Sequence, residues 1–586
     1  MALLGVILAL AAMLRLWAIA DNGFGTEYYA ASVRSMLHSG HLLLYGSFDP
    51  LGFVSIDKPP LAFWIQAGFA AVLGFHGWAI HLPQALAGTA SVAILYFLVR
   101  RYFGVAAGML AAASFAVTPI AIAIDRSNNT DSLLVLCLLL SARVALAGGG
   151  PALVGAMALL GLAFEVKMLA ALVCGPALLA GWWLATALGW RARLGWLAAS
   201  AAALVIVGLS WAVIFDLTPA KDRPYAGSST SNSMLELIVV HNGLQRFVRD
   251  PPPALPPSAL IERPELYDAV PVGPLRLAHP NLAGQFAWFL PLALLGAVLA
   301  WPRHRASAAL WGLWALTYGL VYSAAGGIFH IYYLATLAPP LAALCGIGVA
   351  TLYRGDRRLL AAALAATALW QALIVGSHLA WSSWWLLAPI FALAAALVVL
   401  VRKPVAMAGC AGALLVLPVA WSLSAILAPG NLMLPSASLA RWQGGDDGRG
   451  PVLSGFVGQP AYDPHLAEFL IANRGTARFV IAAVSTRMMA PLIVHGDLPV
   501  MALGGFSGDD PILTLEAFKT MVERGELRFV LLPRAVSFAG RDVAQGRNQH
   551  IVRWIRVNGR VVDRKEWSSQ ALAATRGLVL YDLRRD

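Results

Sequence analysis

The sequence predicts a mainly α-helical, polytopic membrane protein with about thirteen transmembrane helices, followed by a small soluble α/β domain. Hydrophobic residues make up 59% and charged residues 12% of the 586 residues, whereas ordinary soluble domains carry roughly 25% charged residues. The mean hydropathy is +0.70. Several apolar runs have the length of about 17 to 25 residues with which a helix crosses a bilayer. This composition excludes a soluble cytosolic enzyme.

Thirteen apolar runs qualify as membrane spans. A further apolar stretch, 61–76, is short and follows Pro59-Pro60, so we interpret it as an interfacial or re-entrant helix. The predicted spans are residues 2–20, 80–99, 105–124, 132–148, 151–166, 168–187, 195–215, 285–301, 307–324, 331–352, 359–376, 382–401 and 405–427.

The basic residues predict the orientation in an inner membrane. With a cytoplasmic N-terminus, five of the six cytoplasmic loops carry pairs or triplets of Lys and Arg, as the positive-inside rule requires. These loops hold eleven basic residues and one acid, Asp356, so they account for +10 of the net charge of +12. The basic composition therefore indicates orientation and predicts no nucleic-acid partner. The outer loops 21–79 and 216–284 face the outside.

The composition changes at about residue 429, which divides a transmembrane domain, 1–428, from an extracytoplasmic domain, 429–586. Charged residues return, and β-like runs (RFVIAAVS, RFVLLP, GLVLYDL) alternate with helical stretches at 464–473 and 514–524. Such alternation predicts an α/β domain. The four cysteines lie singly in apolar runs and predict no disulfide framework or metal cluster.

Ionisable and aromatic residues gather at the predicted outer ends of the spans. Ionisable groups beside hydrophobic spans are costly and by default mark a functional site. The candidates are Glu27, Tyr29, Asp57, Lys58, Asp125, Arg126, Asp131, Lys167, His241, Arg246, His330 and Tyr333.

Their chemistry favours a site for a lipid phosphate. Lysines and arginines bind phosphate as point charges or through a guanidinium fork. Carboxylates can accept a proton from an incoming hydroxyl or amine, or ligate a divalent metal. The combination predicts a sugar transferred from a lipid phosphate at the outer face.

Structural roles compete with these assignments. Asp57 and Lys58 could form an ordinary loop ion pair, and Asp131 could cap a helix. Lys167 could extend its ammonium to the membrane interface. Asp125 and Arg126 could cap a helix and pair with each other. His330 and its neighbouring tyrosines could anchor the interface.

The order of these motifs resembles a known family. An acid followed by Lys-Pro-Pro-Leu, an Asp-rich loop, an outer Lys, and a His with an Arg five residues later is similar to the GT-C integral-membrane glycosyltransferases of family 39. Protein O-mannosyltransferases and the aminoarabinose transferase of lipid A belong to that family. A bacterial subgroup labelled putative mannosyltransferases is more similar still, on GSFDPLGFVSIDKPPLAFWIQA, DLTPAKDRPYAGSS, GIFHIYYLATLAP and MALGGFSGDDP.

The resemblance implies a GT-C fold and roles for several residues. It implies that Lys58 and Lys167 bind a polyprenyl-phosphate head group with help from Arg246. It also implies that Asp57 and Asp131 are metal or acceptor ligands, with His241 completing such a site. A divalent metal is optional, because Lys and Arg alone can stabilise a phosphate leaving group. Substrate contacts are expected from Tyr29, Asp125, Arg126, His330 and Tyr333.

One departure from the family concerns the general base. The family usually has an Asp-Glu pair in the first loop, and Gly25 and Thr26 occupy those positions here. The base would then be Glu27 or Asp57. We expect transfer of mannose, another hexose or a modified pentose from a polyprenyl-phosphate donor to a lipid, glycan or protein acceptor. A transporter or flippase of lipid-linked sugars is the alternative, although it predicts charges buried in mid-span and a repeat.

Overall fold

The computed structural model describes residues 2–247, 270–327, 329–379, 383–398, 404–429, 433–439, 462–534, 537–538, 541–542, 546–569 and 577–584. The chain divides into two compact units. The first comprises residues 1–22, 81–210 and 265–450, and the second comprises 23–80, 211–264 and 451–586. Both predicted outer loops therefore contribute most of their length to the unit that holds the C-terminal part of the chain.

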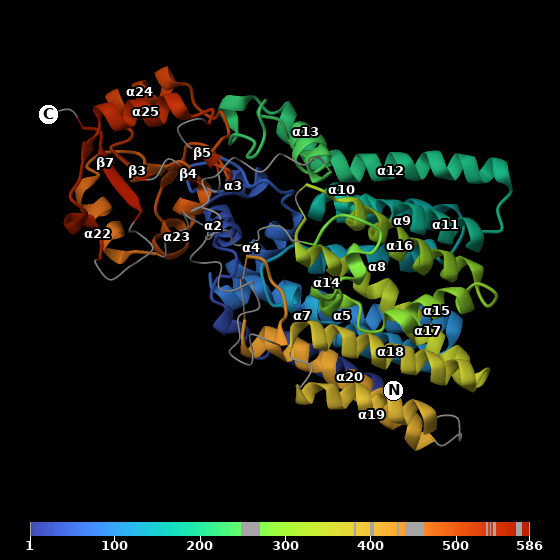
Figure 1. The fold of residues 1–586 in the computed structure, drawn as a ribbon. Helices are drawn as coiled ribbons and strands as arrows, with labels where there is room; N and C mark the ends of the chain where they lie inside the picture. The colour runs from blue at the N-terminus through green and yellow to red at the C-terminus, as the bar shows by residue number, and fades with distance from the viewer. Residues whose placement is uncertain are drawn as a thin grey trace. The chain divides into compact units, whose positions relative to one another are not determined.

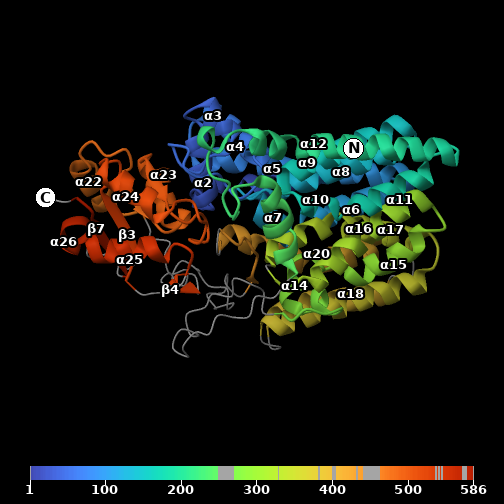
Figure 2. The same cartoon turned by 90° about the horizontal axis from the view of Figure 1, so that it is seen from above.

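The first unit consists of apolar helices that run alongside one another in both views (Figures 1 and 2). Every predicted span overlaps one of these helices or a consecutive pair of them. The helices are α1 (Ala2–Leu16), α5 (Gly77–Phe103), α6 (Val105–Ala116), α7 (Pro119–Asp125), α8 (Asp131–Ala145), α9 (Gly150–Lys167), α10 (Leu169–Leu172), α11 (Gly175–Ala185), α12 (Trp190–Leu217), α14 (Pro280–Phe286), α15 (Leu290–Ala300), α16 (Arg305–Ala324), α17 (Ala338–Arg354), α18 (Arg357–His378), α19 (Leu387–Val398) and α20 (Pro404–Leu427).

The length and hydropathy of these helices make the chain a multi-pass membrane protein. Within the described ranges, seven helices are long and apolar enough to cross a bilayer, and two bent pairs raise the number to nine. The bent pairs are α6 with α7, at 61°, and α14 with α15, at 64°. The number of thirteen crossings stays a prediction. The predicted cytoplasmic loop with Arg402 and Lys403 lies outside the described residues.

The second unit contains the predicted α/β domain. Its sheet has the strand order β2-β1-β3-β7-β6, with β1 parallel to β2 and β3, and β7 antiparallel to β3 and β6. Figure 1 shows α24 and α25 on one side of β3 and β7, and α22 and α23 on the other. The elements are α22 (Pro464–Asn473), β1 (Ile481–Ala483), α23 (Thr486–Gly496), β2 (Val500–Ala502), α24 (Leu515–Glu523), β3 (Phe529–Pro533), β4 (Ser537–Phe538), β5 (Arg541–Asp542), α25 (Gln549–Asn558), β6 (Arg560–Val561), α26 (Arg564–Trp567) and β7 (Leu578–Asp582).

The three β-like runs of the sequence form β1, β3 and β7, and the two expected helices form α22 and α24. The strand β3 is buried along its whole length, which is typical of a strand covered on both faces.

One hydrophobic core joins the first outer loop to this α/β part. That loop forms α2 (Glu27–Met36), α3 (Gly40–Leu44) and α4 (Leu61–Leu73), and the second outer loop adds α13 (Met234–Glu236). Buried residues of α2 and α4 belong to the same cluster as those of α23 and the sheet. The short helix predicted in 61–76 is thus confirmed as α4, and its buried residues belong to the core of the second unit.

Polar contacts reinforce the packing of α2 on α23. The guanidinium of Arg34 donates to the carbonyl of Val494 at 2.9 Å and pairs with Asp497 at 3.1 Å. His38 contacts the same carboxylate at 3.0 Å. The first outer loop is therefore held by the C-terminal part of the chain.

In the first unit, α15 and α17 approach closely at a pair of glycines. A Cβ on Gly296 would collide with the carbonyl of Leu344, and a Cβ on Gly348 would lie 2.8 Å from the carbonyl of Leu292. Small residues let membrane helices pack backbone to backbone. The two glycines therefore permit this crossing.

We predict that Gly296→Val destabilises the protein by about 1–3 kcal/mol, the usual cost of overpacking. Gly312→Val on α16 is the matched control, because nothing lies within 4 Å of a Cβ there. Thermal unfolding in detergent measures both variants. Equal midpoints for the two variants would contradict the close crossing.

Candidate functional site

Asp57 lies at the centre of a polar cluster in the second unit, where the residue is only 5% exposed. Its carboxylate accepts a hydrogen bond from the Lys58 ammonium at 2.9 Å and from the Tyr28 hydroxyl at 3.2 Å. The same hydroxyl accepts the backbone N–H of Asp57 at 3.0 Å. Tyr28 and Lys58 therefore fix both the backbone and the carboxylate of Asp57.

The loop before Asp57 is organised by another buried acid, Asp49. Its carboxylate accepts backbone N–H groups of Leu51, Phe53 and Val54 at 2.9 to 3.1 Å. A carboxylate that gathers several backbone donors makes a tight turn because it satisfies groups that water would otherwise solvate. The Pro-Pro pair then ends the loop, and α4 begins directly after it.

The second outer loop brings His241 to Asp57. The Nε2 atom of His241 lies 3.9 Å from Oδ2 of Asp57, and its Nδ1 atom contacts the side-chain oxygen of Gln245 at 3.1 Å. Burial lowers the pKa of His241 to about 4, with Lys58 and Arg246 adding to the effect and Asp57 opposing it. The imidazole is therefore neutral near pH 7. The Gln245 oxygen assigns the proton to Nδ1, so Nε2 is an acceptor.

Cations keep Asp57 ionised. Burial by itself raises the pKa of Asp57, but the charge and hydrogen bond of Lys58, together with the charge of Arg246, hold it below its ordinary value of 3.8. Asp57 is consequently a carboxylate throughout the physiological range. A carboxylate beside a neutral imidazole can accept a proton from a bound hydroxyl.

The three predicted metal ligands belong to different compact units. Asp57 and His241 approach each other, whereas Asp131 belongs to the other compact unit and pairs with Lys167. The described part of the chain contains no group of three His, Cys, Asp or Glu residues that could hold a metal ion. A metal held by this trio stays a prediction, and no chemical step below runs through one.

A second cluster lies in the first unit. Asp131 begins α8 and Lys167 ends α9, and their side chains form an ion pair. The Lys167 ammonium also lies over the rings of Tyr332 and Tyr333, at 4.8 and 4.6 Å. His330 stacks on Tyr332 at 5.2 Å. The structure thus brings together Asp131, Lys167, His330 and Tyr333, which the sequence places in three separate loops.

Asp125 and Arg126 have structural partners in the first unit. Asp125 accepts a hydrogen bond from Arg15 at 2.7 Å. Arg126 donates to carbonyls at the end of α1, including those of Arg15 at 3.2 Å and Trp17 at 2.5 Å. Arg126 therefore caps a helix, but the two residues do not pair with each other. Their predicted contact with substrate finds no support in these bonds.

Glu27 and Tyr29 lie on α2 in the second unit. Glu27 contacts Nε2 of His495 at 3.1 Å, and Tyr29 packs against Phe63 at 5.2 Å. The partner of Glu27 comes from α23, far along the sequence. Of the two candidate bases, Asp57 is the one surrounded by the Lys58, Tyr28 and His241 side chains.

The sequence singled out the motif MALGGFSGDDP without a role, and the structure places two of its residues beside the Asp57 cluster. The ring of Phe506 lies 4.8 Å from that of Tyr28. The Asp510 carboxylate accepts the backbone N–H of Ser228 at 2.6 Å. The sequence also gives no role to Tyr28, although this residue lies between the candidates Glu27 and Tyr29. Only the tertiary contacts identify these three residues.

Comparison with known proteins gives consistent matches along the chain. Residues 57–211 match the family described as "Dolichyl-phosphate-mannose-protein mannosyltransferase". Residues 466–558 match the family described as "Putative mannosyltransferase YkcB-like, C-terminal".

Two relatives from Bacillus subtilis (strain 168) are similar over nearly their whole length. "Putative mannosyltransferase YycA" is 32% identical over 97% of this chain and 95% of its own. "Putative mannosyltransferase YkcB" is 30% identical over 97% of this chain and 92% of its own.

Among solved structures, ArnT from Cupriavidus metallidurans has the same fold. Its apo structure gives a TM-score of 0.58 at 16% identity, covering 99% of this chain and 98% of ArnT. Its structure bound to undecaprenyl phosphate gives 0.57 at 15% identity, covering 100% and 98%.

We predict that the imidazole of His241 stays neutral down to about pH 5, because its pKa is about 4. Nitrogen NMR of histidine-labelled protein in detergent measures this titration. Lys58→Met should raise the pKa of His241, since a neighbouring cation disfavours the imidazolium. Lys519→Met, on α24, is the control and should leave it unchanged. An unaltered titration in Lys58→Met would contradict the described cluster.

Proposed function

The chain belongs to the family of integral-membrane glycosyltransferases that includes YycA and YkcB, and from this membership we propose a specific reaction. The enzyme transfers mannose, or another hexose or modified pentose, from a polyprenyl-phosphate donor to an acceptor. The reaction takes place at the outer face of the cytoplasmic membrane. A lipid, a glycan or a protein supplies the acceptor group.

The observation that carries this proposal is the environment of Asp57. The buried Asp57 carboxylate is ionised at neutral pH and lies 2.9 Å from a lysine and 3.9 Å from a neutral histidine, so it can accept a proton from a hydroxyl bound beside an anionic substrate. The Nε2 atom of His241 and the Asp57 carboxylate are both acceptors. A hydroxyl bound between them would donate its one proton to one of these acceptors or share it between the two. This supports an acceptor alcohol at this place.

In the proposed reaction, Asp57 acts as the general base. The carboxylate takes the proton of the acceptor hydroxyl while the oxygen attacks the anomeric carbon of the sugar. The bond between that carbon and the phosphate oxygen breaks, and its electron pair leaves with the polyprenyl phosphate. The products are the glycosylated acceptor and polyprenyl phosphate, and Asp57 later returns its proton to water.

Lys58 and Arg246 are the cations that would stabilise the leaving phosphate. One Lys58 proton points to the Asp57 carboxylate and another to the Asp57 carbonyl at 3.3 Å, which leaves the third for the phosphate. Arg246 carries a guanidinium that is held by Asn242 at 3.1 Å. Cations placed where charge develops lower the barrier more than cations that bind the ground state alone.

In the first unit, we assign Lys167 the role of binding the phosphate of the lipid donor. Its ammonium is shared between the Asp131 carboxylate and two tyrosine rings. An incoming phosphate would compete with Asp131 for that ammonium, so Asp131 would set how tightly Lys167 binds. ArnT, which has the same fold, binds undecaprenyl phosphate in one of its crystal structures, and this supports a polyprenyl-phosphate ligand here.

The orientation belongs to the same proposal. Thirteen crossings with a cytoplasmic N-terminus put the second unit outside, where polyprenyl-linked sugars are available and nucleotide sugars are not. The arginine-rich loops then lie in the cytoplasm, as the positive-inside rule requires.

We predict that Asp57→Asn and Lys58→Ala each lower sugar transfer at least about 100-fold, the lower bound for loss of general-base catalysis and for loss of a group that stabilises developing charge, respectively. The assay uses the full chain in liposomes, tritiated polyprenyl-phosphate mannose, and cell-envelope extract from a deletion strain as the acceptor source. Lys221→Ala and Asp222→Asn change an exposed basic and acidic pair of the same unit, and both should keep full activity. Full transfer by both Asp57 and Lys58 variants would refute this function.

A further inference from the structure

The loop 504–511 of the C-terminal part is rigidly built. The side-chain amide of Asn548 donates to the carbonyls of Gly508 and Asp510, at 3.2 and 3.1 Å. Gly505 adopts a φ of +62°, and a Cβ there would collide with the Asp510 carboxylate. The glycine is therefore required for the carboxylate to occupy this position.

Phe506 provides the first connection from this loop to Asp57. Its ring packs on Tyr28 at 4.8 Å, and the guanidinium of Arg487 lies over the Phe506 ring at 4.9 Å from its centroid. Tyr28 in turn binds both the carboxylate and the N–H of Asp57. A change at Phe506 therefore reaches Asp57 through one intervening side chain.

Asp510 provides the second connection. Its carboxylate accepts the N–H of Ser228 at 2.6 Å, and the adjacent Gly227 donates its N–H to the Ser55 hydroxyl at 3.1 Å. The N–H of Ser55 donates to the carbonyl of Tyr225 at 2.8 Å. Ser55 precedes Asp57 by two residues, so Asp510 fixes the segment that carries the base.

We propose that Asp510 and Phe506, two residues of the loop 504–511, are positioning residues for Asp57 in the transferase site. This inference rests on the proposed function. It gives the C-terminal α/β part a role in catalysis, because that part holds the base in place from two sides.

The protonation of Asp510 suits a positioning role. Burial raises the pKa of Asp510 to about 7, the Ser228 N–H opposes this, the charges of Asp57 and Asp509 add to it, and Arg547 opposes it. A neutral acid and an amide have the same shape. Asn at this position would therefore accept the Ser228 N–H much as Asp does.

The test compares Asp510→Ala, Asp510→Asn and Asp509→Ala in the liposome assay. Asp510→Ala should lower kcat at least about 10-fold, since small misplacement of a catalytic group is costly. The KM for the lipid donor should stay within about 2-fold. Asp510→Asn should stay within about 3-fold of the wild type. Asp509→Ala is the control, because its carboxylate accepts the Arg547 N–H and makes no bond to Ser228.

Phe506→Ala and Phe506→Tyr form the second pair, and only the alanine should lower kcat, because tyrosine keeps the ring on Tyr28. Wild-type kcat in Asp510→Ala, or an equal loss in Asp509→Ala, would overturn the proposal. Failure of the proposed function appears separately, as full activity in Asp57→Asn. Thermal unfolding of each variant distinguishes loss of positioning from loss of fold.

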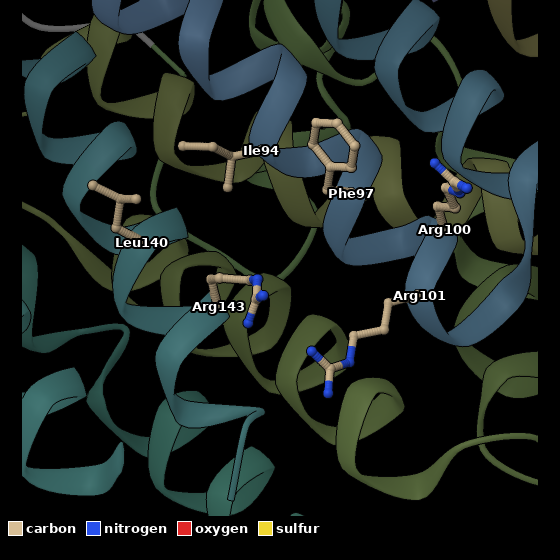
Figure 3. Close-up of a pocket in the computed structure, with 6 residues that line it drawn as sticks. All are labelled: Ile94, Phe97, Arg100, Arg101, Leu140 and Arg143. Carbon is tan, nitrogen blue, oxygen red and sulfur yellow. The ribbon is translucent and has the colours of Figure 1, made fainter. Parts of the chain in front are cut away.

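An independent feature lies in the first unit, in a hollow of about 640 Å³ between α5 and α8. Figure 3 shows Arg101 and Arg143 extending toward one another, with Arg100 on the same side as Arg101. All three arginines are exposed. The lining, which the structure fully describes, contains no carboxylate and is completed by Ile94, Phe97 and Leu140.

The hollow has an apolar wall and a basic end, the two features that a phospholipid site needs for an acyl chain and a phosphate. The apolar residues lie along helices of the membrane unit, and Phe97 is 47% exposed. The arginines lie at the ends of those helices, where the predicted topology places the cytoplasmic surface. Basic pockets between membrane helices on that side bind anionic head groups, and guanidinium groups bind phosphate by charge-assisted hydrogen bonds. The positive-inside rule explains the charges but not the hollow beside them.

We infer that this hollow binds an anionic phospholipid, with its phosphate at the arginines and an acyl chain on the apolar wall. Native mass spectrometry of the full chain with phosphatidylglycerol or phosphatidylcholine tests it. Wild type should retain phosphatidylglycerol, and the triple variant R100Q/R101Q/R143Q should retain about 10-fold less, a difference of about 1.4 kcal/mol. Leu140→Trp fills the hollow with every charge in place and should also lower retention.

The matched control is R354Q/R357Q/R358Q, a triplet of arginines from another predicted cytoplasmic loop. Equal losses in this control and the pocket variant would show general surface charge and overturn the site. Unchanged retention of phosphatidylglycerol in both R100Q/R101Q/R143Q and Leu140→Trp would also overturn the site. Displacement of phosphatidylglycerol by micromolar undecaprenyl phosphate would identify the carrier lipid as the ligand instead.

Discussion

The buried pair of Asp57 and Lys58 is the constraint on which the site depends. Burying two charges costs more than a surface pair returns, and such pairs are often no more stable than apolar residues of equal size. The pair is nevertheless surrounded by the Tyr28 hydroxyl and the His241 imidazole. The pair has a chemical consequence, because Lys58 lowers the pKa of Asp57, which burial alone would raise.

Holding such a pair requires a scaffold that the outer loops alone do not provide. Helices as short as α2, with 10 residues, and α4, with 13, are only marginally stable in water on their own. In the second unit they share a core with α23 and the sheet. The C-terminal part thus supplies hydrophobic surface against which the helices of the charged site pack, and this explains why the outer loops and the C-terminal part form one compact unit.

The sequence predicts the elements well and their partners poorly. Apolar runs and turn residues located the helices and the strands β1, β3 and β7 because hydropathy and periodicity are local properties. Asp57 and Lys58 are neighbours in sequence, so their pairing was predictable. The bond of Glu27 to His495 and the capping of α1 by Arg126 depend on the tertiary fold. The sequence therefore identifies candidate residues as polar residues among apolar runs, whereas their contacts are found only in the structure.

The neutral state of His241 decides what can lie between it and Asp57. With Nδ1 donating to Gln245, the imidazole and the carboxylate present two acceptors 3.9 Å apart. Two facing lone pairs repel unless a donor lies between them. The Lys58 ammonium already satisfies the Asp57 oxygen but does not reach His241 in any described bond. An acceptor hydroxyl bound at that place would donate to the Asp57 oxygen that is to receive its proton, so the contact that binds the substrate is also the path of proton transfer.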